Sequence, residues 1–338
     1  MGLPATLIPG DGIGPEITDA VVQVLDAVKA PFEWDRQYGG LAGIERGGEP
    51  MPQATIDSIT RTKLALKGPL TTPVGGGFRS VNVRLREAFG LYANVRPAKT
   101  LVPGGRYEDI DIVLIRENLE GLYVAFEHFI PVGDDPEAVA ISQGINTKAG
   151  CRRIIRYAFE YALANGRKKV TVVHKANVLK ALTGIFLAAA KEIEPEYRGR
   201  VAMDDRIVDA CAMQLVMKPE QFDVIVTTNL FGDILSDQIA GLVGGLGMAP
   251  GSNIGANAAI FEAVHGSAPD IAGKGIANPT ALLLASCLLL DHVGEQAKAN
   301  AIRDAVEKVL NVDNVRTGDL GGKANTKEFV AAIVARLG

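Results

Sequence analysis

The amino-acid sequence predicts an α/β fold with two domains. Short apolar runs rich in β-branched residues recur along the chain, and each is followed by a polar or glycine-containing turn and a segment with the apolar period of a helix. The runs span Ala5–Ile8, Ile110–Ile115, Val170–Val173 and Asp223–Thr227. Strands that alternate with helices in this way are typical of α/β proteins. The chain has 338 residues, which is long for one hydrophobic core and favours two domains with a central cleft between them.

Two segments rich in glycine and proline predict where the domains meet. Pro97–Gly105 contains two prolines and two glycines, and Val243–Gly255 contains five glycines and one proline. Such segments interrupt helices and strands and often connect domains. They predict a discontinuous larger domain, residues 1–97 with 250–338, around a smaller domain of residues 98–249.

The apolar pattern weakens in one segment of the smaller domain. Between Phe126 and Gly150, Pro131, Gly133 and Pro136 separate short alternating pieces. We therefore expect an irregular arm at about residues 125–150, of the kind that joins two copies of a chain.

Composition argues against several classes of protein. The net charge is −4 and no dense run of lysine or arginine occurs, so nucleic-acid binding is not expected. The longest apolar run, Ala281–Leu290, is about half the length of a membrane-spanning helix and predicts a buried helix instead. The start of the chain does not resemble a signal peptide, and we expect a cytoplasmic protein. Cys151, Cys211 and Cys287 lie far apart without metal-site spacing and are expected to be reduced, structural thiols.

Polar residues follow three of the predicted strands. They are Arg116–Asn118 after the second strand, His174–Asn177 after the third and Thr227–Asn229 after the fourth. Because ligands of open α/β sheets bind beyond the carboxyl ends of the strands, these residues predict a substrate site.

Two aspartates lie one turn apart on the helix predicted after Asn229. Asp233 and Asp237 are at positions i and i+4, which places both carboxylates on one face. Two such carboxylates suit a hard divalent cation, and Asp209 could supply a third oxygen ligand. Each aspartate taken singly is also compatible with an ordinary helix-end or surface role.

Arginines from several elements are candidates for binding carboxylates. Ser80 begins a predicted helix that carries Asn82 one turn before an arginine on the same face. The alternating strand Leu91–Pro97 is expected to end at its proline, directly after another arginine. Planar guanidinium groups bind carboxylates through paired hydrogen bonds. The candidates are Arg86, Arg96 and Arg116, although each alone could be a surface residue.

Two glycine-rich segments differ from the usual dinucleotide fingerprint. Gly10–Glu16 follows the first predicted strand, but its spacing is Gly-x-Gly-x-Gly-Pro, so an ordinary Rossmann site is disfavoured. Glu262–Gly273 forms a second loop that is longer than a turn requires and rich in polar residues. It is either a binding loop or a plain surface loop.

Six of these segments together resemble the β-decarboxylating dehydrogenase family, which comprises isocitrate, homoisocitrate and 3-isopropylmalate dehydrogenases. The matching motifs occur in the family order and lie at Gly10–Glu16, Lys67–Pro73, Leu91–Pro97, Arg116–Asn118, Asn229–Asp233 and His265–Pro269. The resemblance runs from Leu7 to Gly338. It implies the two-domain isocitrate/isopropylmalate dehydrogenase fold, with a nucleotide site of non-Rossmann type and a central inter-domain cleft.

The resemblance also implies a substrate and a cofactor. Isocitrate enzymes carry Ser-x-Asn ahead of the first arginine, as Ser80 and Asn82 do here. These small polar groups leave room for an additional carboxylate, which an aliphatic wall would exclude by its desolvation cost. Asp270 and Ile271 stand where NADP-dependent relatives carry a Lys-Tyr pair. A carboxylate accepts ribose hydroxyls and repels a phosphate, so NAD is favoured.

The roles implied for single residues follow the family pattern. Substrate is bound by Ser80, Asn82, Arg86, Arg96, Arg116 and Asn177, and Mg²⁺ or Mn²⁺ by Asp209, Asp233 and Asp237. Tyr123 is the general acid, and Lys175 relays the proton of the substrate hydroxyl. NAD is bound by Thr72, Glu262, His265, Gly266, Ser267, Ala268, Asp270, Ile271 and Asn278. Lys175 and Asp209 come from a second copy, which implies a homodimer or a larger assembly with shared sites.

The implied reaction is the metal-dependent oxidation and decarboxylation of isocitrate to 2-oxoglutarate and CO₂ with reduction of NAD. Homoisocitrate and 3-isopropylmalate are alternative substrates within the family. A non-catalytic regulatory subunit of a hetero-oligomeric isocitrate dehydrogenase is a second alternative. A third is an ordinary Rossmann hydroxyacid dehydrogenase, which would need no metal.

Overall fold

In the computed structural model the chain forms two compact units. The structure describes residues 2–72, 78–103 and 107–338. Unit 1 comprises Met1–Leu91, Arg96–Ile110 and Ala240–Gly338, and unit 2 comprises Tyr92–Val95 and Asp111–Ile239. Pro73, Gly104 and Gly105, which belong to the motif and the hinge predicted from the sequence, lie outside the described residues.

The unit boundaries differ from those expected after residue 97 and before residue 250. Residues 98–110 and 240–249 belong to unit 1 rather than to the other unit. The reason is packing, because Leu101, Val102 and Met248 contact the apolar core of unit 1. Glycines and prolines mark where regular structure stops, and they do not show which core the flanking side chains join.

Unit 1 is built around a mostly parallel sheet. Its strands are β1 (Leu3–Ile8), β2 (Phe32–Arg36), β3 (Leu64–Lys67), β11 (Pro250–Ile254) and β12 (Ala259–Ala263). They run in the order β2-β1-β3-β12-β11, and the only antiparallel pair described among them is β11 with β12. The predicted strand Ala5–Ile8 is confirmed as the buried part of β1.

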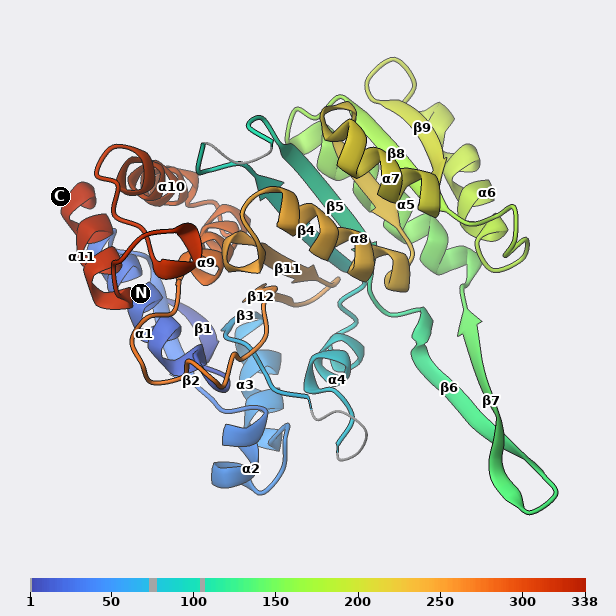
Figure 1. The fold of residues 1–338 in the computed structure, drawn as a ribbon, viewed down its shortest axis with the longest axis horizontal. Coiled ribbons are helices and arrows are strands. Elements are labelled where there is room, and N and C mark those ends of the chain that lie inside the picture. Colours follow the sequence, from blue (N-terminus) through green and yellow to red (C-terminus); the bar gives the residue numbers. More distant parts are fainter. Residues whose placement is uncertain (1, 73–77, 104–106) are drawn as a thin grey trace. The chain divides into compact units, whose positions relative to one another are not determined.

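Helices cover this sheet with two apolar clusters (Figure 1). They are α1 (Gly14–Ala27), α2 (Leu41–Gly47), α3 (Gln53–Thr62), α4 (Val81–Ala88), α9 (Thr280–His292), α10 (Gln296–Asn311) and α11 (Thr326–Leu337), with short 3₁₀ turns at Leu246–Met248 and Gly318–Leu320. The larger cluster joins Ile17 of α1 and Leu282 of α9 to Phe261 of β12. The smaller one joins Ile59 of α3 and Leu85 of α4. The apolar run Ala281–Leu290 is confirmed as a buried helix.

Unit 2 contains a parallel sheet of four strands in the order β5-β10-β8-β9. The strands are β5 (Asp111–Glu117), β8 (Lys169–His174), β9 (Ala202–Ile207) and β10 (Val224–Thr227). The helices are α5 (Lys148–Ala164), α6 (Gly184–Ile193), α7 (Val208–Met217) and α8 (Asn229–Leu242), with 3₁₀ turns at Glu194–Glu196 and Pro219–Gln221. Buried side chains such as Ile155 and Phe159 line the inner face of α5. All three runs predicted as strands in this region are confirmed.

Strand β4 (Ala93–Lys99) corrects one prediction about a proline. The strand was expected to stop at Pro97, but it continues two residues further. Proline cannot donate a ladder hydrogen bond, yet its fixed φ is compatible with an extended chain. A strand can therefore pass through a proline where its neighbour requires no donor at that position.

A two-stranded antiparallel ribbon replaces the irregular arm expected near residues 125–150. It consists of β6 (Gly121–Val132) and β7 (Asp135–Ile145), which extend away from the sheet of unit 2 (Figure 1). Most of its residues are exposed, including Phe126 and Phe129, each more than half exposed. The ribbon pairs with no other strand in the described residues, and its register shifts between Ile130 and Val132, at Pro131, where a proline cannot donate a ladder hydrogen bond.

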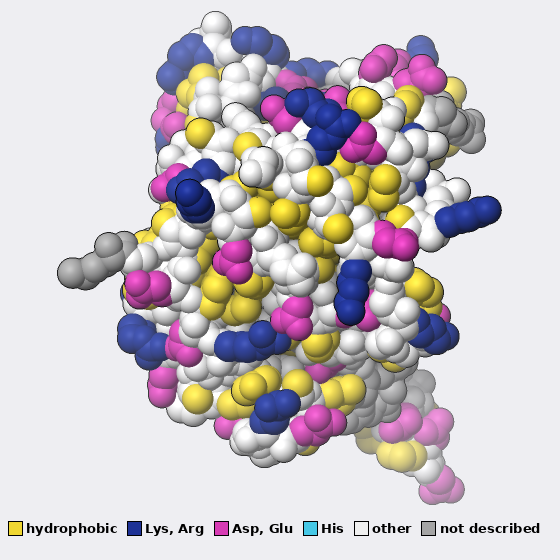
Figure 2. Space-filling model, turned by 90° about the vertical axis from the view of Figure 1, so that its left-hand side faces the viewer, with side chains coloured by type: hydrophobic (Ala, Val, Ile, Leu, Met, Phe, Trp, Pro, Cys, Tyr) yellow, Lys and Arg dark blue, Asp and Glu magenta, His cyan; other side chains and the backbone are white. Residues whose placement is uncertain are grey.

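The two units together confirm the predicted α/β class. Within the described ranges, no helix has the length and low charge required to span a bilayer. The face shown in Figure 2 carries lysine and arginine side chains interspersed with aspartate and glutamate. Cys151, Cys211 and Cys287 are buried free thiols, and burial raises the pKa of each to about 12.

Candidate active site

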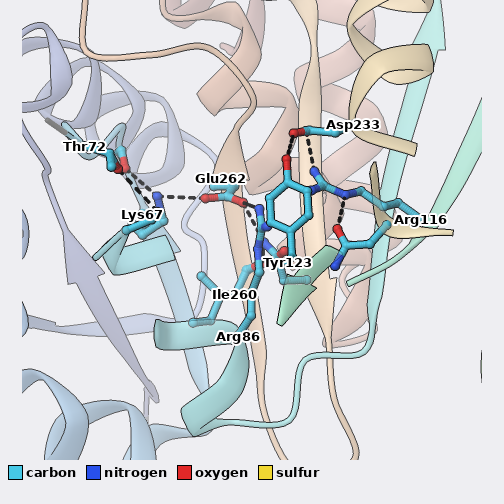
Figure 3. A network of polar contacts seen from close by, with 12 residues as sticks. Lys67, Thr72, Arg86, Arg116, Tyr123, Asp233, Ile260 and Glu262 are labelled. Carbon is cyan, nitrogen blue, oxygen red and sulfur yellow. Dashed lines mark hydrogen bonds and ion pairs between the residues drawn. The ribbon is translucent and has the colours of Figure 1, made fainter. Parts of the chain in front are cut away.

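In unit 2, Arg116, Tyr123 and Asp233 form a compact polar cluster. The Arg116 guanidinium and the Tyr123 hydroxyl both donate to the Asp233 carboxylate, one to each oxygen (Figure 3). Arg116 also donates from Nε to Oδ1 of Asn229 at 2.9 Å. These residues come from the end of β5, the start of β6 and the first turns of α8, as expected for polar groups beyond parallel strands.

Arg116 is held tightly but keeps one donor group unused. It is 1% exposed, and a Cβ on Gly232 would lie 2.6 Å from its Cγ, so only glycine fits there on α8. Among the described residues, Nη2 of Arg116 is buried without a hydrogen-bond partner. Buried unpaired donors are uncommon in folded proteins and require an acceptor. A ligand carboxylate would meet that requirement.

The phenol of Tyr123 is set up to keep its proton. Burial raises its pKa above the ordinary value, and the hydrogen bond to the Asp233 carboxylate raises it further. The guanidinium of Arg116 lies over the ring, 4.9 Å from its centroid, and partly opposes this shift. A phenol that stays protonated at neutral pH can serve as a proton donor.

Lys175 and Asp209 form a second pair in unit 2. Lys175 follows β8 and donates from Nζ to Oδ1 of Asp209 at 2.5 Å, and this bond lowers the pKa of the Asp209 carboxyl. The Asp209 side chain is 68% exposed. Asn177, two residues beyond Lys175, is also exposed. The pair is therefore accessible to a ligand or to another chain.

The carboxylates predicted to bind a metal do not lie together in one chain. Asp233 belongs to the cluster with Arg116 and Tyr123, and Asp209 belongs to the pair with Lys175. Asp233 and Asp237 lie on α8 one turn apart, with Asp237 exposed. In the described part of a single chain, no three acidic, histidine or cysteine side chains gather into a metal site. The donors nevertheless suit a hard cation, because carboxylate oxygens are the ligands that Mg²⁺ and Mn²⁺ prefer.

In unit 1, a buried ion pair joins Lys67 to Glu262. Nζ of Lys67, at the end of β3, lies 2.7 Å from the carboxylate at the end of β12, and both side chains are almost fully buried (Figure 3). Asn253 donates to the same carboxylate at 2.8 Å, and Arg86 lies 4.0 Å from it. Burial alone would raise the pKa of Glu262, but the charges of Lys67 and Arg86 outweigh it and hold the value at about 2.

The predicted substrate residues of unit 1 lie on α4 and β4. Ser80 is the residue before α4, and its hydroxyl accepts from the Thr72 hydroxyl at 3.3 Å. Asn82 is on the first turn, and its Oδ1 is buried without a partner in the described residues. Arg86 and Arg96 are both 8% exposed. Buried arginine and amide groups of this kind are characteristic of a site that binds carboxylates.

A cavity of about 640 Å³ in unit 1 lies beside the loop after β12. Its lining comes from this loop, from the turn before α1 and from segments that follow α8 and α10. The lining residues are Ile13, Gly247, His265, Gly266, Ala268, Ile271, Ile276, Ala277, Asn278, Gly318, Asp319, Lys323 and Ala324. Nδ1 of His265 contacts the Gly266 carbonyl at 2.9 Å, so this nitrogen carries the hydrogen and Nε2 is an acceptor. Burial lowers the pKa of His265, which favours the neutral ring. A mainly apolar cavity with few polar groups suits a nucleoside.

The cavity contains most but not all of the predicted cofactor residues. His265, Gly266, Ala268, Ile271 and Asn278 line it. Thr72, Glu262, Ser267 and Asp270 are not among the lining residues, and Asp270 is exposed. The acidic group that does line it is Asp319, which accepts from Asn278 at 2.9 Å. Sequence reasoning missed Asp319, because nothing in the local pattern near residue 319 indicates which loop it faces.

Lys67 is a second residue that sequence reasoning missed. It begins the motif Lys67–Pro73, from which no role for the lysine itself was predicted. The available signal was a lysine that ends the apolar run Leu64–Leu66, where an ordinary surface position is improbable. In the structure Lys67 is 2% exposed.

Comparison with known proteins decides the family. The sequence profile of isocitrate/isopropylmalate dehydrogenases matches residues 5–333. The chain belongs to this family. The resemblance drawn from the six motifs is thereby confirmed, and so is the predicted fold.

Relatives from several organisms are similar over nearly the whole chain. An isocitrate dehydrogenase from Methylococcus capsulatus has a crystal structure with a TM-score of 0.96, 54% identity and coverage of 100% of this chain and 99% of that one. A regulatory subunit of the mitochondrial NAD isocitrate dehydrogenase of Dictyostelium discoideum is 47% identical over 98% of this chain and 91% of its own length. Catalytic subunit 5 of the mitochondrial NAD enzyme of Arabidopsis thaliana is 45% identical over 98% and 88%.

The relatives overturn one prediction and leave another open. The expected cytoplasmic location is wrong on this comparison, because the similar NAD isocitrate dehydrogenase subunits from Dictyostelium and Arabidopsis are mitochondrial. That prediction rested on the composition of the first residues alone. Cofactor use varies within the family, since an NADP isocitrate dehydrogenase from Thermus thermophilus is 47% identical over 98% of this chain and 67% of its own length.

Proposed function

We propose that this member of the family oxidises and decarboxylates isocitrate to 2-oxoglutarate and CO₂ with NAD as the hydride acceptor. The observation that carries the proposal is the cluster of Arg116, Tyr123 and Asp233. It joins a buried guanidinium with an unused donor to a protonated phenol and to a carboxylate on the predicted metal-binding helix. A hydroxy acid that loses CO₂ needs these three groups: a carboxylate binder, a proton donor and a cation ligand.

The arginines bind the substrate carboxylates in this proposal. Arg116 offers its free Nη2, and Arg86 and Arg96 offer buried guanidinium groups from unit 1. Ser80 and Asn82 add a hydroxyl and an amide, which favour a substrate with a further carboxylate over one with an aliphatic group. Asn177 is assigned to the same substrate by its place after β8.

Tyr123 and Lys175 transfer protons in the proposed reaction. Tyr123 gives its proton to the carbon that has lost CO₂, and its raised pKa keeps the phenol protonated until then. Lys175 takes up the proton of the substrate hydroxyl. Only the neutral amine has a lone pair to accept this proton, so Lys175 acts in that form, and Asp209 positions its Nζ by accepting the 2.5 Å hydrogen bond.

A divalent cation, Mg²⁺ or Mn²⁺, bound by Asp233, Asp237 and Asp209 would supply Lewis-acid polarisation of the substrate oxygens.

NAD would occupy the cavity next to His265, with Thr72, Glu262, Ser267 and Asp270 as further contacts. A nucleotide without a 2′-phosphate is favoured because Asp319 and Asp270 place carboxylates in or near this region. We assign Lys175 and Asp209 to a second copy of the chain, so the active form is a homodimer or a larger assembly.

A steady-state assay tests this function. The purified chain should form NADH and CO₂ from isocitrate and NAD, with a higher kcat/KM than with NADP, homoisocitrate or 3-isopropylmalate. Preference for 3-isopropylmalate would overturn the substrate assignment. Preference for NADP would overturn the cofactor assignment while leaving the reaction intact.

A regulatory role is the second candidate function, because the similar relatives include a protein with that role. Such a protein would bind isocitrate or nucleotide without turnover. The acid Tyr123 and the pair Lys175 and Asp209 are all present, which favours catalysis. The discriminating measurement is activity of the purified chain on its own, since a regulatory chain needs a catalytic partner.

A further inference from the structure

The turn Gly10–Glu16 between β1 and α1 has no assigned role in the reaction. Its spacing differs from that of a phosphate-binding loop, and the structure shows a physical reason. The N–H groups of Asp11, Ile13 and Gly14 donate to the carbonyls of Pro69, Ser267 and Asp11. These donors are therefore already used within the protein, and a nucleotide phosphate could not receive them.

Asp11 ties the turn to the segment that carries Thr72. The Asp11 side chain is buried, and its Oδ2 accepts the backbone N–H of Thr71 at 2.8 Å. Its Oδ1 accepts the N–H of Ala42 at 3.1 Å, and its own N–H donates to the Pro69 carbonyl at 2.8 Å. One carboxylate thus fixes the backbone directly before Thr72, a predicted cofactor residue.

The next residues tie the same turn to the loop after β12. The Ile13 N–H donates to the Ser267 carbonyl at 2.9 Å. Gly12 has a φ of +58°, and a Cβ there would lie 2.0 Å from that carbonyl oxygen, so the close approach requires glycine. The Thr71 and Ser267 hydroxyls share a hydrogen bond of 2.7 Å, which links the two loops directly.

Glu16 reaches a third segment from the first turn of α1. Its two carboxylate oxygens accept the N–H groups of Gly275 and Ala277, each at 3.3 Å. Ala277 and the following Asn278 line the cavity assigned to NAD. The segment near residue 71 and two places in the stretch 267–277, about 200 residues later in the sequence, therefore meet at one turn.

We propose that the turn Gly10–Glu16 positions the three cofactor-binding segments and that Asp11 is a positioning residue for NAD binding. This inference rests on the proposed function, because it concerns the same cofactor site. In this proposal Asp11 acts through the Thr71 backbone and not through a contact of its own with NAD. Its two oxygens are both needed, because each accepts a different N–H.

Replacement of Asp11 by asparagine tests the proposal with little change in size. An amide has one acceptor oxygen, so one N–H loses its partner and faces the amide NH₂ instead. The loop before Thr72 should lose its fixed position. We expect the Kd for NAD, measured by calorimetry, and the KM for NAD to rise about tenfold or more while kcat changes less.

The matched control is Asp35→Asn in the same unit. Asp35 accepts from the side chains of Ser58 and Gln37, and these contacts lie away from the cofactor loops. Asp35→Asn should lower the unfolding temperature without raising the Kd for NAD. The proposal is overturned if Asp11→Asn leaves this Kd within about twofold of wild type, or if both variants raise it equally.

A double-mutant cycle separates positioning from general loosening. Thr71→Val removes the hydroxyl contact with Ser267 but leaves the Thr71 N–H in place. Its effect on the Kd for NAD should be non-additive with Asp11→Asn and additive with Asp35→Asn. Additivity in both cycles contradicts the proposal.

A further variant covers the case in which Asp11→Asn does not fold. Glu16→Gln removes one acceptor from the pair that holds residues 275 and 277 and should also raise the Kd for NAD. An unchanged Kd for NAD in Glu16→Gln contradicts the proposed positioning role of the turn. Because Kd is measured without turnover, a chain that binds NAD but does not oxidise isocitrate refutes the proposed function and leaves this inference testable.

Discussion

At the scale of single residues, Tyr123 has the most informative surroundings in unit 2. Its hydroxyl donates to a carboxylate, which is an acceptor that opposes loss of the proton. Burial acts in the same direction, so the pKa of this phenol is raised. The Tyr123 phenol is therefore still protonated when the carbon that has lost CO₂ must receive a proton.

Tyr123→Phe should lower kcat for conversion of isocitrate to 2-oxoglutarate by about a hundredfold or more, because general acid catalysis typically contributes that much. The ring and its contact with Arg116 remain, so the KM for isocitrate should change little. Tyr157→Phe is the matched control, since Tyr157 is a tyrosine of the same unit with no part in this cluster. Equal kcat values for Tyr123→Phe and wild type would contradict the assignment.

Glu117, directly after Arg116, gives a prediction about pH. Burial raises its pKa from 4.5 to about 6, against two backbone N–H bonds that lower it. A group with a raised folded-state pKa contributes stability that is complete below about pH 4.5 and lost as the pH rises through 6. Denaturant titrations should show a loss of about 2 kcal/mol in this interval relative to Glu117→Gln. Parallel pH profiles for the two proteins would contradict the shift.

At the scale of elements, α8 combines two functions on one helix. Gly232 allows Arg116 to pack against the helix, and Asp233 and Asp237 present carboxylates one turn apart. The sequence allowed this helix and its acidic face to be predicted from spacing alone. The contact of Tyr123 with the same helix could not be predicted, because it joins residues that are far apart in the chain.

Asp237→Asn should raise the Mg²⁺ concentration needed for half-maximal activity by about tenfold or more, because a ligand oxygen with full negative charge is lost. Asp304→Asn, an exposed aspartate on α10, provides a control of the same chemistry. EDTA should abolish activity in the wild type, and Mg²⁺ or Mn²⁺ should restore it. Activity that survives EDTA would favour a metal-free dehydrogenase.

The strands show which parts of a fold are visible in a sequence. Buried parallel strands such as β5 and β10 are continuous apolar runs and were identified directly. Strand β2 has a mixed pattern and β11 contains glycine and asparagine, so neither gives such a signal. Lys67 was missed because its role was not considered although it ends an apolar run, and Asp319, which is exposed, was missed because its loop pattern does not show that it lines the cavity.

At the scale of the whole molecule, the two acid–base residues of unit 2 have separate partners. Tyr123 bonds to Asp233, and Lys175 bonds to Asp209. This separation agrees with the proposal that one reaction site takes Tyr123 from one copy and Lys175 from another. The family resemblance implied such sharing, but no single-chain pattern can establish it.

Mixing two inactive variants tests the shared site. Tyr123→Phe and Lys175→Met should each keep about 1% of wild-type activity or less when alone. Unfolding and refolding them together in equal amounts should restore about a quarter of wild-type activity in a dimer. Half of the dimers formed from equal amounts contain one copy of each variant, and each such hybrid dimer has one intact site. A mixture that stays inactive, while the same treatment restores the wild type, would place both residues within one copy.

The β6–β7 ribbon links folding to protein concentration. Two strands alone are marginally stable in water. This ribbon exposes the side chains of Phe126, Phe129 and Val132, and its outer edges pair with no other strand in the described residues. Its order should therefore increase when another copy covers those edges, so that dilution weakens the same contacts that assembly creates. The unfolding temperature of the protein should then rise with its concentration, and the ribbon should be the first segment to exchange its amide hydrogens on dilution.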